Sequence, residues 1–205
     1  MTHHEQPTDI PDRKRELRQL ARSRAASLTA ADRQRLSLRV VDHLLERPEW
    51  QNARRILGYL ALKDELDLST ALESALRAGK TVALPRYVRD QGNYCAALVT
   101  ESFAALPLGA FGIPEPGAGA PVLPLNQLDF ILVPGVAFDA SGGRLGRGKG
   151  FYDRLLANVN NATCIKCGIA ADEQIVTGIP AEAHDVPMNF ILTPTRWLVP
   201  RPGPD

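Results

Sequence analysis

The stretch LDFILVPGVAFDASGGRLGRGKGFYDRLLA, residues 128–157, leads from an apolar run through a loop of glycines and cations into a new helix. Five glycines and three cations fall within nine residues, GGRLGRGKG (142–150). The run DFILVP (129–134) is apolar on both faces, as is typical of a central strand in a parallel sheet. Ligands of open α/β sheets bind beyond the carboxyl ends of the strands, so we expect a binding site at this loop.

Short apolar runs alternate with helical segments on both sides of this stretch. Wholly apolar or alternating runs predict strands, and apolar residues at every third or fourth position predict helices. The predicted strands are 55–61, 81–85, 94–100, 129–134, 163–170 and 190–193, and the predicted helices are 12–27, 30 to just before Pro48, 67–79 and 151–159. The alternation predicts an α/β fold with helices on both faces of the sheet.

Composition sets further bounds on the protein. The chain has 205 residues and a formal net charge of +1, which is less basic than expected for a protein that mainly neutralises nucleic-acid phosphates. No apolar run has the length of a membrane span, and no secretory signal opens the chain. We expect residues 1–11 to be a disordered lead-in and residues 12–200 to form a single domain.

The three cysteines do not predict a disulfide framework or a zinc site. CIKC (164–167) has the spacing of half a zinc site, but no second pair exists in the chain. We therefore expect packed thiols in or beside a strand, which favours a reducing, cytoplasmic compartment.

The loop 142–150 has the residue types of an anion-binding site. Glycine permits positive φ and close approach of the backbone to a ligand, and Arg144, Arg147 and Lys149 supply positive charge. The alternative is a solvated basic turn. The loop is not a standard P-loop, because Gly150 follows Lys149 where Ser or Thr should hold magnesium.

Asp153 lies in the first turn of the helix that follows the loop. A carboxylate there can simply interact favourably with the helix dipole. Beside bound phosphates, however, a bare carboxylate would repel the ligand unless a magnesium ion lay between them. The combination therefore favours a metal–nucleoside polyphosphate as the ligand.

The segment PGVAFDASGGRLGRGKGFYDRLL (134–156) closely resembles the signature of the 5-formyltetrahydrofolate cyclo-ligase family. The likeness spans most of the chain, because further blocks that resemble the family follow in the expected order: KRELR (14–18), KDELDL (63–68), AGKTVALPRY (78–87), FGIPEP (111–116) and HDVPMNFILTP (184–194). The resemblance implies a three-layer α/β/α sandwich with a mostly parallel sheet and N-terminal helices, similar to ribose-phosphate isomerases and CoA transferases.

The resemblance also implies the reaction. The enzyme would close 5-formyltetrahydrofolate to 5,10-methenyltetrahydrofolate with ATP and Mg²⁺, through a phosphorylated formyl intermediate. The formyl oxygen would attack the γ-phosphate, the second folate nitrogen would attack the activated carbon, and phosphate would leave.

Residue roles follow from the same resemblance. Arg147, Lys149 and Tyr152 would be catalytic, although Tyr152 could equally be a packed aromatic. The ATP-binding residues would be Lys14, Arg18, Arg144 at the entrance of the loop, Gly146, Arg147, Gly148, Lys149, Gly150 and Tyr152. Glu65, Arg86 and Tyr87 would bind the folate, and Asp153 with Asn189 would hold magnesium.

Two positions depart from the family pattern. Phe151 stands where many members have tyrosine, and Asn189 stands where some members have a second magnesium-binding aspartate. Asp185 lies close in sequence, and whether it replaces that aspartate stays open.

Two other functions remain open at this point. One is a sugar-phosphate or CoA-handling enzyme on a similar fold. The other is RNA binding through the N-terminal helix, which carries six cations within residues 13–24. We favour the enzyme, with small-molecule partners, no nucleic acid, no membrane and a monomeric state.

Overall fold

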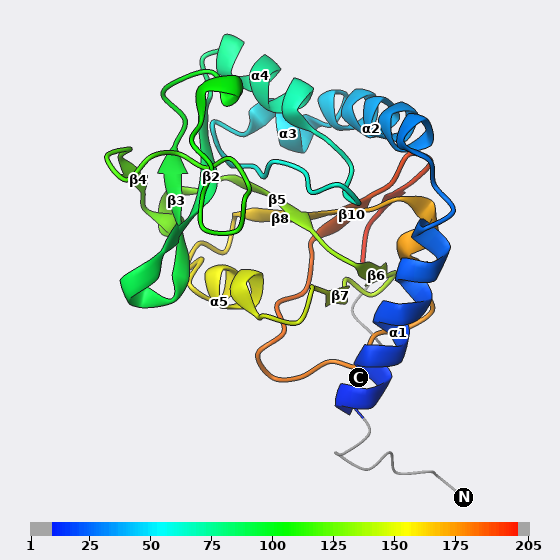
Figure 1. Ribbon diagram of the computed structural model, residues 1–205. Coiled ribbons are helices and arrows are strands. Elements are labelled where there is room, and N and C mark those ends of the chain that lie inside the picture. Colours follow the sequence, from blue (N-terminus) through cyan, green and yellow to red (C-terminus); the bar gives the residue numbers. More distant parts are fainter. Residues whose placement is uncertain (1–9, 201–205) are drawn as a thin grey trace, which may run out of the picture.

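The computed structural model describes residues 10–200, which form a large sheet covered by helices (Figure 1). The sheet has eight strands in the order β11 (Trp197–Leu198), β10 (Phe190–Leu192), β8 (Ile165–Ile169), β5 (Phe130–Pro134), β1 (Arg55–Leu57), β2 (Thr81–Val88), β3 (Asn93–Leu98) and β4 (Val122–Leu123). The inner strands β10, β8, β5, β1 and β2 run parallel, and the outer pairs are antiparallel. This confirms the predicted α/β class with a mostly parallel sheet.

Strand β5 lies in the middle of the sheet, as its sequence predicts. Its residues Phe130, Ile131, Leu132 and Val133 are fully buried, because helices cover both faces. Parallel pairing with β1 on one side and β8 on the other satisfies its backbone. The chain therefore leaves β5 at Pro134 in a fixed direction and carries the glycine loop to the same edge of the sheet as the end of β1.

One face of the sheet is covered by α2 (Ala30–Leu45), α3 (Pro48–Asn52) and α4 (Ser69–Arg77) (Figure 1). Thr29 and Asp32 form a capping box at the start of α2. Pro48 lies beyond the end of α2 and begins α3, where its fixed φ is favourable. Trp50 of α3 packs edge-on against Phe130 with ring centroids 5.6 Å apart, which ties this layer to the centre of the sheet.

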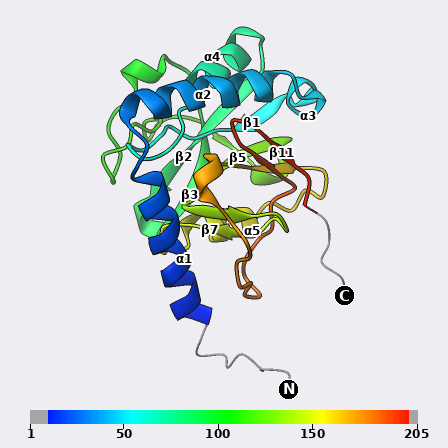
Figure 2. The ribbon, with the colours of Figure 1, turned by 90° about the vertical axis from the view of Figure 1, so that its right-hand side faces the viewer.

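The opposite face carries α5 (Phe151–Ala157), a small sheet and α1 (Ile10–Ala25) (Figures 1 and 2). The small sheet has the order β7 (Arg144–Leu145), β6 (Ala137–Asp139) and β9 (Ile175–Val176). Leu17 and Ala21 of α1 pack against Val136 and Val176 in a separate apolar cluster. Helix α1 is thereby fixed beside the segment that contains the glycine loop.

Several predicted boundaries differ from the structure. The strand predicted over 55–61 ends at Leu57, and residues 58–68 leave the sheet before α4 begins. The first part of the predicted loop 142–150 belongs to the β6–β7 hairpin. Helix α1 begins at Ile10, so only residues 1–9 of the predicted lead-in lie outside the described residues. The prediction of a single domain over 12–200 stays a prediction.

The buried face of α1 includes a charged side chain. Leu20 is 44% exposed, whereas Lys14 is 6% exposed. A lysine can be buried in this way when its charge is paired, and the Lys14 ammonium contacts two carboxylates.

The cysteines are free thiols, as predicted. Cys164 and Cys167 are buried, and burial raises the pKa of the Cys164 thiol to about 11. Burial also raises the pKa of Cys167, so both are protonated at neutral pH. Within residues 10–200, no helix combines the length and the apolar character needed to cross a membrane.

Candidate active site

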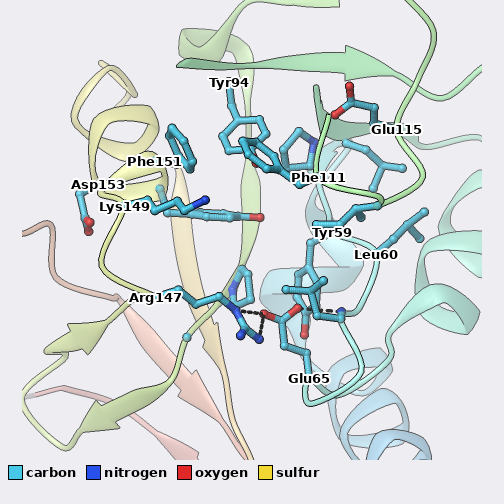
Figure 3. A pocket seen from close by; sticks show the side chains of 18 of the residues that line it. Tyr59, Leu60, Glu65, Tyr94, Phe111, Glu115, Arg147, Lys149, Phe151 and Asp153 are labelled. Carbon is cyan, nitrogen blue, oxygen red and sulfur yellow. Dashed lines mark hydrogen bonds and ion pairs between the residues drawn. The ribbon is translucent and has the colours of Figure 1, made fainter. Parts of the chain in front are cut away.

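A pocket of about 420 Å³ lies beyond the carboxyl ends of β1 and β5 (Figure 3). Tyr59 follows β1, Pro134 ends β5, and the glycine loop and the start of α5 complete this side of the pocket. The position is the one that the strand–loop–helix order predicts for an α/β sheet. Eight of the predicted site residues line it: Glu65, Arg144, Gly146, Arg147, Lys149, Gly150, Tyr152 and Asp153.

The glycine loop forms one wall of the pocket. Gly148 and Gly150 have φ values of +97° and +64°, a region in which a side chain is strained, so glycine is needed for this turn. Arg147 and Lys149 extend from the loop over the pocket (Figure 3). Helix α5 has only seven residues, so most of the positive charge here comes from these two side chains rather than from the helix dipole.

Arg147 crosses the pocket to the opposite wall. Its Nη2 lies 3.2 Å and its Nε 3.4 Å from Glu65 Oε1 (Figure 3). Nη2 also lies 2.5 Å from Asp64 Oδ1. Burial alone would raise the pKa of the Asp64 carboxyl, but the hydrogen bond and charge of Arg147 outweigh it and hold this pKa below its ordinary value. A predicted phosphate-binding residue therefore contacts a predicted folate-binding residue directly.

Glu65 is the buried acid of this opposite wall. Its side chain is 11% exposed, and burial raises the pKa of its carboxyl despite the nearby Arg147. Oε2 accepts a hydrogen bond from the backbone N–H of Leu62 at 3.0 Å, which fixes the orientation of the carboxylate. A carboxylate held in this way is suited to accept hydrogen bonds from a ligand with neighbouring N–H groups.

Arg144 lies deeper than predicted. It belongs to β7, its side chain is 3% exposed, and it forms an ion pair with Asp153. Nη1 donates to the Pro134 carbonyl at 3.2 Å, and the guanidinium lies 5.7 Å from the centre of the Tyr152 ring. Arg144 thus joins the end of β5 to the start of α5 at the floor of the pocket, instead of standing at the entrance of the loop.

Tyr152 lies between these charged groups. Burial raises the pKa of its phenol, and the charge of Glu65 raises it further. The hydroxyl is therefore protonated at neutral pH and can donate a hydrogen bond.

The sequence did not identify the residues of a further, mostly apolar wall of the pocket. This wall is formed by Tyr94 of β3 and by part of the Pro/Gly-rich connection, residues 106–124. The pocket-lining residues of this connection are Phe111, Ile113, Pro114 and Glu115. The Lys149 ammonium lies 4.9 Å from the centre of the Phe111 ring, a cation–π contact that joins this wall to the glycine loop. The signals available in the sequence were the unusual length of residues 106–124 and the FGIPEP block within them.

The N-terminal cations lie beside the glycine loop rather than in the pocket. Arg18 Nε donates to the carbonyl of Gly146 at 2.9 Å. The Lys14 ammonium lies 2.7 Å from Glu182 and 2.6 Å from Asp185, so these two acids engage its charge, and its contact with a phosphate stays a prediction. Burial would raise the pKa of Asp185, but the hydrogen bonds from Lys14 and from the backbone N–H of Glu182, together with the charge of Lys14, lower this pKa below its ordinary value.

Two predicted folate-binding residues lie outside the pocket lining, as Gly148 of the glycine loop does. Arg86 Nη1 donates to the carbonyls of Gly117, Ala118 and Ala120 and so holds the Pro/Gly-rich connection. Tyr87 packs its ring edge-on against Phe111 behind the apolar wall. These two residues support the pocket rather than line it.

Asn189 and Asp185 are not brought to Asp153. Asn189 precedes β10, and its Oδ1 accepts the backbone N–H of Lys166 at 2.8 Å, toward the amino ends of the parallel strands. Asp185 and Glu182 form a cluster with His184 that could hold a metal ion, but two of its carboxylates contact the Lys14 ammonium. The structure thus places Asp153 alone, of the three predicted metal candidates, at the pocket.

Few cations of the N-terminal helix are free for nucleic acid. Arg13 pairs with Glu16 at 3.2 Å, and Arg15 pairs with Asp12 at 2.9 Å. With Lys14 and Arg18 also engaged, four of the six cations noted in the sequence contact other groups of the protein. The basic surface that suggested RNA binding is reduced accordingly.

Comparison with known proteins points to one family. Residues 11–194 match the family model of the 5-formyltetrahydrofolate cyclo-ligase family. The chain is 33% identical over 187 residues to 5-formyltetrahydrofolate cyclo-ligase of Mus musculus, covering 87% of this chain and 92% of that protein. It is 35% identical over 181 residues to the protein of that name in Haemophilus influenzae, covering 88% and 97%.

Solved structures agree with this comparison. The NMR structure of 5,10-methenyltetrahydrofolate synthetase from Aquifex aeolicus is 35% identical, with a TM-score of 0.79, and the match covers 94% of this chain and 95% of that one. The synthetase structure from Mycoplasma pneumoniae is 22% identical with a TM-score of 0.69, covering 88% and 98%, and supports the fold.

Proposed function

The chain belongs to the 5-formyltetrahydrofolate cyclo-ligase family, and we propose that it converts 5-formyltetrahydrofolate and ATP to 5,10-methenyltetrahydrofolate, ADP and phosphate. The observation that carries this proposal is the composition of the pocket. A cationic glycine loop faces a buried carboxylate, and an apolar aromatic wall joins the two. The loop suits a polyphosphate, the carboxylate suits the N–H edge of a pterin, and the aromatic wall suits its ring.

ATP solves a leaving-group problem in this reaction. The formyl oxygen attacks the γ-phosphorus, and the bond to ADP breaks. N10 of the folate then attacks the formyl carbon, the C–O bond breaks, and the oxygen leaves with phosphate while N10 loses its proton. An amide oxygen leaves poorly, whereas the same oxygen as part of phosphate leaves readily.

The glycine loop performs the phosphate half of the reaction. Phosphoryl transfer depends mostly on positioning and charge stabilisation. Arg147 and Lys149 stabilise the charge on the transferred group, and the backbone around Gly146, Gly148 and Gly150 allows close approach. The hydroxyl of Tyr152 is protonated and donates a hydrogen bond to the ligand in this half of the pocket.

The walls that face the loop bind the folate. Glu65 accepts hydrogen bonds from the N–H groups of the pterin, because its carboxylate is buried and already oriented by Leu62. Arg86 and Tyr87 shape this half from behind by holding the Pro/Gly-rich connection and its aromatic residues.

Asp153 is the residue that would hold Mg²⁺, which when bound neutralises polyphosphate charge. A metal donor is available there, because Arg144 contacts only Oδ1 of Asp153 and magnesium prefers carboxylate oxygens. Asn189 lies too near the amino ends of the strands to share this site without a rearrangement, and Lys14 would have to leave Glu182 and Asp185 to reach a phosphate. Arg18 acts on the loop itself through the Gly146 carbonyl.

The setting proposed for the enzyme is a monomer in the cytoplasm, with small-molecule substrates and without nucleic-acid or membrane partners. Free buried thiols favour a reducing compartment. Size-exclusion chromatography with light scattering tests the monomeric state.

An isotope experiment tests the proposed reaction. The purified protein is given Mg-ATP and 5-formyltetrahydrofolate labelled with ¹⁸O in the formyl group. The mechanism predicts one ¹⁸O atom in each released phosphate. Unlabelled phosphate with methenyl product would contradict the phosphorylated intermediate, and no ATP-dependent product would contradict the function.

A further inference from the structure

The contact between Arg147 and the Asp64–Glu65 pair links the two halves of the pocket. Arg147 comes from the glycine loop, and it reaches Glu65 across the pocket (Figure 3). Both acids belong to the segment that follows β1. The contact to Asp64, at 2.5 Å, is shorter than the contacts to Glu65, at 3.2 and 3.4 Å. Asp64 does not line the pocket, so it is not placed to contact a substrate directly.

In this arrangement Arg147 and Glu65 are occupied with each other rather than with a ligand. A guanidinium held by two carboxylates cannot turn its fork fully to a polyphosphate on the loop. Equally, Arg147 and a pterin would compete for Oε1 of Glu65, because Arg147 contacts this oxygen and Leu62 already donates to Oε2. Both substrates therefore favour the release of Arg147 from the acids.

We propose, on the basis of the proposed function, that Asp64 is a positioning residue that holds Arg147 across the empty pocket and thereby couples nucleotide binding to folate binding. A polyphosphate draws Arg147 to the loop and leaves Glu65 free for the pterin. A bound pterin occupies Glu65 and leaves Arg147 free for the polyphosphate. Each substrate thus shifts the population of Arg147 toward the state that the other one binds.

The exposure of the Asp64–Arg147 ion pair to solvent limits how strongly one substrate can affect the binding of the other. The Asp64 side chain is 53% exposed and that of Arg147 is 40% exposed, so the contact is solvent-screened. Exposed ion pairs of this kind shift an equilibrium by at most about fivefold. We therefore expect each substrate to tighten the binding of the other by about two- to fivefold.

Asp64→Asn tests the proposal, because the substitution keeps the shape of the side chain and removes its charge at an exposed position. Isothermal titration gives the Kd of a non-hydrolysable ATP analogue with Mg²⁺, and of 5-formyltetrahydrofolate, each alone and with the other present. We expect the variant to bind each ligand alone about two- to fivefold more tightly and to show less coupling between them. Asp64→Glu should restore the wild-type coupling.

Asp42→Asn is the matched control, since Asp42 is an exposed acid on α2 that does not line the pocket. It should leave both affinities and the coupling unchanged. Suppose that the wild-type protein turns over but that Asp64→Asn binds each ligand no more tightly than the wild type does. This result would overturn the coupling role of Asp64 and leave the proposed function standing. A wild-type protein without ATP-dependent product and without nucleotide binding would overturn the proposed function as well.

Discussion

Glu65→Gln gives the sharpest test of the folate half of the pocket. The substitution preserves the shape of the side chain and can keep the hydrogen bond from Leu62, but it removes the negative charge and places an NH₂ group where an oxygen faced the pterin. A hydrogen bond to a charged group contributes about 1.5–3 kcal/mol. Because tenfold in affinity corresponds to about 1.4 kcal/mol, we expect kcat/KM for 5-formyltetrahydrofolate to fall by about tenfold to 150-fold.

The loss should be confined to the folate. The Glu65 side chain is 11% exposed, and its charge carries a desolvation cost that the neutral amide lacks. Arg147 keeps its contact with Asp64, so the free energy of unfolding should change by less than about 1 kcal/mol.

The assay for Glu65→Gln is steady-state formation of the methenyl product at saturating ATP, with urea unfolding as the check on stability. Glu73→Gln on α4 is the matched control, because within residues 10–200 Glu73 forms only an exposed pair with Arg77 at 3.6 Å. A Glu65→Gln enzyme with unchanged kcat/KM for the folate, or one impaired only in its KM for ATP, would refute the assignment of Glu65 to the pterin.

Three further predictions concern the loop, the metal and the anchoring of α1. Lys149→Ala should cost about 3 kcal/mol of transition-state stabilisation, roughly a hundredfold in kcat/KM; a near-normal rate would remove Lys149 from the mechanism. Asp153→Asn should raise the Mg²⁺ concentration needed for half-maximal activity at least about tenfold, measured by magnesium titration at fixed ATP, because a carboxylate binds magnesium better than an amide does; an unchanged titration would place the metal elsewhere. The pKa of Asp185 is lowered in the folded protein, so the stability it contributes is fully present above its unfolded pKa of about 3.9 and is lost as the pH falls through the folded pKa. In urea unfolding between pH 6 and pH 3, Lys14→Met should therefore lose less stability than the wild type, and equal losses would contradict the pairing.

The parts of the fold that the sequence predicts well have strong local signals. DFILVP is apolar on both faces and became the buried central strand β5, because only a strand covered on both sides can bury every residue. Thr29 and Asp32 satisfy each other's backbone across three residues, so α2 begins where predicted. These features depend on neighbours in the chain.

The short strands escape prediction for the opposite reason. β6 and β7 have three and two residues, too few for a period to appear, and they form because each pairs with a distant partner or across a tight turn. The early end of β1 at Leu57 has the same origin, since residues 58–61 remain apolar but serve the pocket wall and the core.

In the candidate site too, features with a local sequence signal were predictable and contacts between distant residues were not. The loop residues were predictable because glycines and cations alternate within one short segment. The contact of Arg147 with Glu65 spans 82 positions, and that of Lys14 with Asp185 spans 171, so neither is visible in local sequence. Both contacts depend on the sheet order and on the packing of α1, which the sequence determines only through the whole fold.

The measurement that tests the central claim most directly is the near-ultraviolet absorbance of the methenyl product. Purified protein is mixed with 5-formyltetrahydrofolate and Mg-ATP, with parallel reactions that lack ATP or contain Lys149→Ala. We predict a methenyl band that grows only with ATP, with one ADP released per product, and much more slowly in the variant. A band that grows equally without ATP, or no band from a folded protein with both substrates present, would contradict the function assigned to this pocket.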